Sequence, residues 1–437
     1  MNGRWRKVIL APSVDAGAQG LFANACEALL GITMQNLRLQ LETSYAQHPS
    51  FQCGRPALVL DATALDRFSA PYKLAREFGP RLTRAQRAAG QQQCLNALAD
   101  VFGGLTAQTT DAHERAFLEE LHGECRRLLL EELKSFCSTT LRDSVSFVNP
   151  QNQRDVLQLA RDRCYFGRLS PSVSQELLAL GSGELGRCRE NARHGRLTRA
   201  DLSANSGPAV RRIMAVLNRE FRALGVLDAV SAYAGSRMTV TAVALELSVP
   251  QATWWGNFLE PLERAPKTLY AHLDESIACP KSIVYLTQVD ASNGPTGAYP
   301  HALEAMDLNP LQEIVGRVVG NVGNVVGSTL HEYYSKKYHQ SMSSERFRAH
   351  FMRLPPELRF NSHLGWDVCP GSTLEAALAG AEQQMVGAPG TFIVFDGARL
   401  LHRGGMVQAG ERVALQVIFS NATRASRVLA KIRRAIA

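Results

Sequence analysis

Apolar residues recur every three or four positions in two long stretches of the chain, and each stretch predicts an amphipathic helix. In residues 111–136 the apolar positions lie four apart, with charged residues on the opposite face: Phe117, Leu121, Cys125, Leu129 and Leu133. Residues 208–227 show a similar spacing and follow a Ser-Gly-Pro sequence, which is typical of a helix start. Most of the first 145 residues look helical in this way, so we predict a mostly helical N-terminal region over residues 1–145.

The pattern changes at about residue 237 to short, β-branched apolar runs that are separated by turn sequences. Four runs predict strands: MTVTAVALELSVP, KSIVYLTQVD, TFIVFDG and ERVALQVIFS. Helices do not alternate regularly with these runs, so the strands predict an antiparallel sandwich or barrel. Residues 302–390 interrupt the strand pattern and predict a long helical insertion.

Polar segments mark the remaining divisions of the chain. The sequence SFVNPQNQ at residues 146–153 predicts a boundary between the N-terminal region and the rest. Residues 184–208 contain five arginines and predict a solvated loop, with the guiding of an anionic substrate as the alternative. The chain ends in RASRVLAKIRRAIA, which predicts a basic helix over residues 426–437.

Four glycines in the predicted insertion lie three or four residues apart: Gly316, Gly320, Gly323 and Gly327. No lysine follows the last of them, so the pattern of a phosphate-binding loop is absent. Close helix packing or a mobile lid suits this spacing better.

Composition narrows the class of protein. The chain has 437 residues, enough for two or three domains or for one enlarged catalytic domain. Its net charge of +8 is mild and no nucleic-acid-binding motif occurs, so we expect no nucleic-acid partner. No apolar run approaches the roughly 18 residues that a membrane helix needs, so we expect no membrane span.

Cysteine usage and the N-terminus bear on the compartment. The nine cysteines are odd in number and form no C-x-x-C pair, which argues against a disulfide framework or a zinc site. Pro12 and Asp15 interrupt the apolar stretch that follows the basic start, so a signal peptide is not predicted. We therefore expect a cytoplasmic protein.

The candidate chemistry begins at the sequence AHLDES, which places His272 and Asp274 two residues apart at the end of an apolar run. Residues i and i+2 of a strand face the same side, so this imidazole and carboxylate can reach one point. A hydrogen-bonded surface pair is the alternative. A second stretch, TFIVFDGARLLHRGGMVQAGERVALQVIFS, carries His402 beside one predicted strand and Arg412 at the start of the next. We predict that His402 is a third ligand and that Arg412 lies across a hairpin, one or two residue pairs deeper.

This residue set indicates a metal site of a particular kind. Two imidazoles and one carboxylate on one face of an ion form the facial triad of non-haem Fe(II) oxygenases, which leaves open positions for substrate and O2. A buried arginine beside the triad suits bidentate binding of a carboxylate on a small cosubstrate.

With these motifs the sequence resembles the Fe(II)/2-oxoglutarate-dependent oxygenases, and their phytanoyl-CoA dioxygenase-like branch in particular. The motifs are AHLDES, YLTQVDASNGPTG, FDGARLLHRGG and ERVALQVIF, and the resemblance covers about residues 205–422. It implies an α+β fold, in which a double-stranded β-helix (jelly-roll) core is packed by helices. With the mostly helical N-terminal region outside it, the oxygenase domain would span residues 146–425, including the insertion.

The resemblance also implies a role for individual residues. His272, Asp274 and His402 would bind Fe(II), Arg412 would pair with the distal carboxylate of 2-oxoglutarate, and Ile283 would form a wall against this cosubstrate. The implied reaction hydroxylates an unactivated C–H bond of a metabolite and consumes O2, with succinate and CO2 as co-products. The carboxylate at position 274 favours hydroxylation or desaturation, because halogenating relatives carry a small residue there.

Substrate binding is less defined by the sequence. The resemblance implies a small-molecule substrate or one of acyl or glycan type, and three residues are candidate contacts: Arg403, Trp255 and His363. His363 is also an alternative metal ligand, while core packing is the competing interpretation for Trp255 and His363. The chain departs from the family at Ala271, where an aromatic residue is common, and at Ala414, where related families place serine.

Two other functions are weighed against the oxygenase. A non-catalytic jelly-roll protein that binds a ligand or partner would not bind 2-oxoglutarate. A cupin-like metalloenzyme would keep the metal ligands and tolerate loss of Arg412. For the N-terminal helices, packing, homodimer formation and covering of the substrate all remain open.

Overall fold

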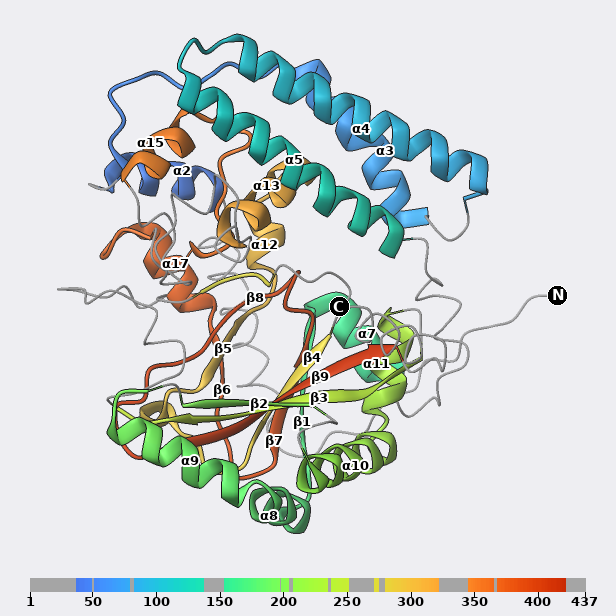
Figure 1. The fold of residues 1–437 in the computed structure, drawn as a ribbon, viewed down its shortest axis with the longest axis vertical. Coiled ribbons are helices and arrows are strands. Elements are labelled where there is room, and N and C mark those ends of the chain that lie inside the picture. Colours follow the sequence, from blue (N-terminus) through green and yellow to red (C-terminus); the bar gives the residue numbers. More distant parts are fainter. Residues whose placement is uncertain are drawn as a thin grey trace, which may run out of the picture.

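The computed structural model describes residues 37–48, 51–78, 82–136, 153–196, 198–203, 207–234, 237–250, 271–274, 280–321, 345–364 and 368–421. These residues form a layer of helices and a layer of antiparallel sheet, which lie one above the other in Figure 1. None of the described helices is long and apolar enough to cross a membrane. The basic C-terminal helix predicted over residues 426–437 lies outside the described residues.

Among the described residues up to 136, the helical layer contains four helices: α2 (Leu37–Gln47), α3 (Ala62–Phe78), α4 (Arg84–Ala107) and α5 (Ala112–Ser135). The helix predicted over residues 111–136 is confirmed as α5. Its start is fixed by Asp111, whose carboxylate accepts hydrogen bonds from the N–H groups of His113 and Glu114.

The described part of the insertion supplies four more helices to the same layer: α12 (Ala302–Ala305), α13 (Pro310–Asn321), α15 (Glu345–Arg353) and α17 (Thr373–Ala381). Residues of these helices and of α2 to α5 form one hydrophobic core, in which the Phe117 and Phe347 rings make an edge contact at 5.5 Å. The N-terminal region and the insertion therefore pack as one body. The domain boundaries given above remain predictions.

Buried ion pairs also join the insertion to the N-terminal helices. The Arg317 guanidinium of α13 donates to the Glu132 carboxylate of α5 at 2.7 Å, and both side chains are 3% exposed. Similar contacts of 2.7 Å join other parts of the two segments: Arg353 to Glu114 and Arg359 to Glu42. Each pair connects residues that are at least 185 positions apart in sequence.

Close packing of the insertion explains two of the four spaced glycines. A Cβ on Gly316 would overlap the Phe360 ring, and one on Gly320 would overlap Ser362 Oγ and the His363 ring. The prediction of close packing is therefore confirmed for these two, although the segment packed against α13 (residues 360–363) is not helical. Gly323 and Gly327 lie outside the described residues.

The sheet layer is antiparallel throughout its described pairs. A six-stranded sheet has the order β1-β7-β4-β9-β3-β2: β1 (Cys164–Arg168), β2 (Arg199–Ser203), β3 (Met238–Ser248), β4 (Lys281–Tyr285), β7 (Thr391–Phe395) and β9 (Arg412–Asn421). A three-stranded sheet has the order β6-β5-β8: β5 (Thr296–Tyr299), β6 (Gln383–Met385) and β8 (Leu401–Arg403). The four predicted strands are confirmed as β3, β4, β7 and β9.

Among the described residues, these helices lie against one face of the six-stranded sheet (Figure 1): α7 (Gln153–Asp162), α8 (Pro171–Leu180), α9 (Ser182–Arg193), α10 (Pro208–Ala223) and α11 (Val226–Ala234). Their apolar residues share a core with outward-facing residues of the sheet, such as Val284 and Leu415. The helix predicted over residues 208–227 is confirmed as α10, which begins with Pro208.

The loop predicted over residues 184–208 is wrong for most of its length, because α9 and β2 occupy it. Three of the arginines lie on an exposed face of α9, where Arg187 pairs with Glu184 and Arg193 pairs with Glu190, whereas the half-buried Arg199 of β2 pairs with Glu246. Such i,i+3 pairs stabilise a helix. The sequence interpretation weighed the arginines and missed the apolar side of α9, which is buried.

Candidate metal centre

Three donor side chains converge where the two sheets meet the helical layer. The Oδ1 atom of Asp274 lies 3.8 Å from His272 Nε2 and 3.9 Å from His402 Nε2, and all three donors lie within 4.8 Å of one another. Two donors bound at about 2.1 Å to one ion can be at most about 4.2 Å apart, so the carboxylate can share an ion with each imidazole. In the described part of the chain, this is the one group of three or more histidine, cysteine or acidic residues whose ligand atoms lie close enough to hold a metal ion.

Backbone pairing brings the three donors together. His272 and His402 face each other in an antiparallel bridge and exchange both N–H···O hydrogen bonds, at 2.8 and 3.0 Å. The Asp274 N–H donates to the Gly397 carbonyl at 2.8 Å, which aligns its side chain with the same edge. His402 belongs to β8, so the metal centre lies beside the three-stranded sheet.

The protonation state of His402 suits metal binding. Its Nδ1 lies 2.9 Å from the Leu400 carbonyl oxygen, which can only accept, so Nδ1 carries the proton and Nε2 presents its lone pair. Burial lowers the pKa of His402 to about 4, although the Asp274 charge acts in the opposite direction. The ring is therefore neutral at pH 7, as a metal ligand must be.

The Asp274 carboxylate is ionised and held from its other side. Burial raises the pKa of this carboxyl, but neighbouring groups, first among them the Lys281 ammonium, more than offset that effect and hold the pKa well below its ordinary value. Asp274 Oδ2 lies 2.5 Å from Lys281 Nζ, while Oδ1 points at the histidines. A Cβ on Gly397 would overlap Oδ2, so the carboxylate fits there only because residue 397 has no side chain.

Gly397→Ala is expected to weaken Fe(II) binding by about ten- to a hundredfold, the usual cost of disturbing a residue that supports a metal ligand. The added methyl must push Asp274 away from the position it shares with the histidines. Anaerobic titration calorimetry measures the change. Gly380→Ala is the control, because a Cβ at this helical position meets nothing within 4 Å, and equal affinities in the two variants would contradict the packing argument.

Arg412 lies in the same space between the two sheets, at the end away from the three donor side chains. The guanidinium is buried and donates to Ser248 Oγ at 3.1 Å and to the Gly294 carbonyl oxygen. The Tyr285 phenol lies beside it, where burial raises the phenol pKa and Arg412 acts in the opposite direction. The predicted hairpin between His402 and Arg412 is wrong, because β8 pairs with β5 whereas β9 pairs with β3 and β4.

Strand β4 connects the two ends of the site. Alternate residues of a strand face opposite sides, so Lys281, Ile283 and Tyr285 share one face, and Val284 packs on the other side among the helices. Tyr285 belongs to a small apolar cluster between the two sheets, and Ile283 packs against this cluster. Four residues of strand span about 13 Å. Ile283 therefore lies between the metal-centre end and the Arg412 end, and its contact with a cosubstrate remains a prediction.

The three candidate substrate contacts have different surroundings. His363 stacks on His272, with ring centroids 5.2 Å apart and planes at 15°, and burial followed by the His272 charge lowers its pKa to about 3. The Arg403 guanidinium is held by the Glu382 carboxylate at 2.7 and 3.0 Å. Trp255 lies outside the described residues. A role in substrate binding remains a prediction for all three.

Sequence reasoning missed Lys281, Gly397 and Ser248. Gly397 had a local signal, because an Asp-Gly pair between a strand and His402 is a turn sequence. Ser248 stands opposite Arg412 in the register of β3 and β9, which only the pairing reveals. Lys281 lies seven residues from Asp274, across the Cys279-Pro280 break, and had no local signal.

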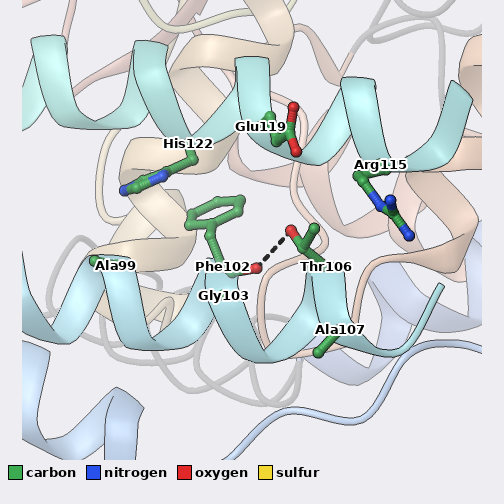
Figure 2. Close-up of a pocket in the computed structure, with 8 residues that line it drawn as sticks. All are labelled: Ala99, Phe102, Gly103, Thr106, Ala107, Arg115, Glu119 and His122. Carbon is green, nitrogen blue, oxygen red and sulfur yellow. Dashed lines mark hydrogen bonds between the residues drawn. The ribbon is translucent and has the colours of Figure 1, made fainter. Parts of the chain in front are cut away.

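A hollow lies away from the metal centre, between α4 and α5 of the helical layer (Figure 2). Its floor is formed by residues such as Ala99 and Gly103, and Arg115 and His122 line its other side. The His122 ring stacks on Phe102 at 5.3 Å, so this imidazole is engaged in packing.

No family model and no curated protein matches the sequence. Solved structures match it weakly. The non-heme alpha ketoglutarate dependent carbocyclase SnoK from nogalamycin biosynthesis is 11% identical, with 65% of this chain and 87% of that chain covered and a TM-score of 0.34. EctD from S. alaskensis with 2-oxoglutarate and 5-hydroxyectoine is 13% identical (61% and 75% covered, TM-score 0.33). HygX from Streptomyces hygroscopicus with nickel and 2-oxoglutarate bound is 11% identical (62% and 87% covered, TM-score 0.32). At this identity and TM-score the likeness implies nothing about the reaction of this chain.

Proposed function

We propose that this protein is an Fe(II)- and 2-oxoglutarate-dependent oxygenase that hydroxylates an unactivated C–H bond of a small molecule. The observation that carries the proposal is the convergence of His272 Nε2, His402 Nε2 and Asp274 Oδ1, with neutral His402 and ionised Asp274. Two imidazoles and one carboxylate fit the facial triad of a non-haem Fe(II) centre. We further propose that the two antiparallel sheets are the halves of a jelly roll, with the centre between them.

In this proposal 2-oxoglutarate lies along the inner face of β4. Its 2-oxo acid end would face the metal ligands and its distal carboxylate would pair with Arg412, with the Ser248 hydroxyl as a neighbouring donor. The Gln416 side chain stands opposite Ile283 on this face, and its buried Oε1 has no hydrogen-bond partner among the described residues. A buried polar group without a protein partner is expected where a bound molecule completes the site.

Bound Fe(II) would supply the activation of O2, coupled to decarboxylation of 2-oxoglutarate to succinate and CO2. The protein's own groups then have separate tasks. The Leu400 carbonyl keeps the His402 tautomer, the Gly397 carbonyl orients Asp274, and Arg412 fixes the cosubstrate. The substrate would enter beside the insertion, since the Leu273 N–H donates to the Ser362 carbonyl at 2.8 Å and places this segment next to the ligands.

Calorimetric titration of the Fe(II)-loaded protein with 2-oxoglutarate under anaerobic conditions tests the proposal. We expect saturable binding with one site per chain, and succinate formation once O2 and a substrate are supplied. A protein that binds metal but shows no heat of 2-oxoglutarate binding would instead be a cupin-like metalloprotein. A protein that binds neither would be a non-catalytic ligand- or partner-binding protein.

Arg412→Leu is expected to raise the Kd for 2-oxoglutarate at least about tenfold, because a hydrogen bond to a charged group contributes about 1.5–3 kcal/mol. The same titration measures it. Arg189→Met is the control, since this exposed arginine pairs with Glu411, the residue before Arg412, and does not reach the interior. Unchanged affinity in Arg412→Leu would remove the arginine from the cosubstrate site.

A further inference from the structure

The Asp274 carboxylate has two partners of opposite kind. One oxygen, Oδ1, faces the imidazoles of His272 and His402 at 3.8 and 3.9 Å. The other, Oδ2, is 2.5 Å from the Lys281 ammonium. The two side chains are 25% and 12% exposed, so water is largely excluded from the contact.

Lys281 is itself held in place by the sheet. It stands in β4 between two strands, opposite Phe395 of β7 and Ile418 of β9. Its Nζ lies 5.2 Å from the Phe395 ring centroid, within the range of a cation–π contact. The Phe395 ring in turn contacts the His402 ring at 4.8 Å. The ammonium is therefore fixed by the same residues that surround the metal ligands.

This arrangement limits how the carboxylate can bind an ion. A carboxylate binds metal ions through one oxygen or through both. An ammonium on Oδ2 and the close approach of Gly397 to the same atom leave only Oδ1 for the ion. A facial triad functions through its open positions, and a second carboxylate oxygen would occupy one of them.

We propose that Lys281 is a positioning residue that restricts Asp274 to one-oxygen coordination and so keeps a metal position open for 2-oxoglutarate and O2. This inference rests on the proposed function. Without the ammonium, Oδ2 is free to turn toward the ion, and the 2-oxo acid must compete with it. The positive charge also offsets the negative charge that the cosubstrate brings into a buried site.

The test compares Lys281→Met, which keeps the length of the side chain and removes its charge, with Lys281→Arg, which keeps a charged donor. Lys73→Met, at an exposed position of α3, is the control. All proteins are loaded with Co(II), whose visible absorption reports the number and arrangement of ligands. The readouts are this spectrum before 2-oxoglutarate is added and the Kd for 2-oxoglutarate by calorimetry.

We expect Lys281→Met to change the Co(II) spectrum and to raise the Kd for 2-oxoglutarate about tenfold, comparable to the lower bound for metal affinity or activity when a group supporting a metal ligand is lost. Lys281→Arg should lie close to the unmutated protein. An unchanged spectrum in Lys281→Met would overturn the inference, even with weaker 2-oxoglutarate binding, because charge attraction alone explains that result. Failure of the unmutated protein to bind Co(II) would instead refute the proposed function.

Discussion

Replacing His272 with alanine is expected to weaken Fe(II) binding by about a thousandfold or more. Loss of a group that merely supports a metal ligand costs about ten- to a hundredfold in affinity, and in the proposed centre His272 is itself one of three protein donors. The remaining His402 and Asp274 cannot complete a facial triad. Anaerobic titration of the metal-free protein, read by calorimetry, measures the loss.

Two other histidines make this experiment specific. His113 is exposed on α5, so His113→Ala should bind Fe(II) as the unmutated protein does. His363 stacks on the His272 ring but is outside the group of three donors, so His363→Ala should cost less than His272→Ala. If His272→Ala retains normal affinity for Fe(II), the oxygenase proposal fails. If His363→Ala loses as much affinity for Fe(II) as His272→Ala does, His363 is itself a metal ligand, which is the alternative that the sequence suggested.

Local sequence predicted the parts of the site that depend on spacing. The i, i+2 spacing of His272 and Asp274 predicted that both side chains face one side, and the apolar runs before His402 and after Arg412 identified β7 and β9. These patterns can be recognised in the sequence because each depends on only a few neighbouring residues. The short strand β8, which holds His402 opposite His272, has only three residues and gave no pattern of its own.

Partner choice between distant segments could not be predicted. Lys281 contacts Asp274 because β4 returns past it, and Arg412 joins Ser248 because β9 pairs with β3 in a particular register. The predicted hairpin failed for the same reason: the nine residues between His402 and Arg412 lead from one sheet to the other. One sequence gives no information about which charged residues meet across such distances.

The packing of the N-terminal helices against the insertion is another long-range feature of the fold. The substitution Glu132→Ala tests how much this packing contributes to stability. This change is expected to lower the free energy of unfolding by about 3–5 kcal/mol, the cost of removing one partner of a buried ion pair. The Arg317 guanidinium that Glu132 binds is 3% exposed, so water cannot replace the carboxylate. Chemical denaturation followed by circular dichroism measures the change.

The neighbouring Glu131→Ala provides a matched control, because Glu131 is 62% exposed and pairs with Arg127 on the surface. Its effect should stay within about 0.5 kcal/mol. Exchanging both partners for apolar residues, Glu132→Leu with Arg317→Met, should restore most of the lost stability, since an apolar pair of similar volume avoids the uncompensated charge. Equal stability of Glu132→Ala and Glu131→Ala would mean that the helical layer is not held together through this pair.

The same variant connects the stability of the helical layer to the metal centre. Arg317 and Gly320 belong to α13, and Gly320 lies against Ser362 and His363, the latter stacked on His272. A change in the packing of α13 should therefore affect the position of His272 through these contacts alone. We expect Glu132→Ala to weaken Fe(II) binding by less than the tenfold lower bound for a group that supports a ligand directly, and Glu132→Leu with Arg317→Met to recover it. Weakening that persists in the double variant would show that the charges, rather than the packing of α13, act on the metal centre.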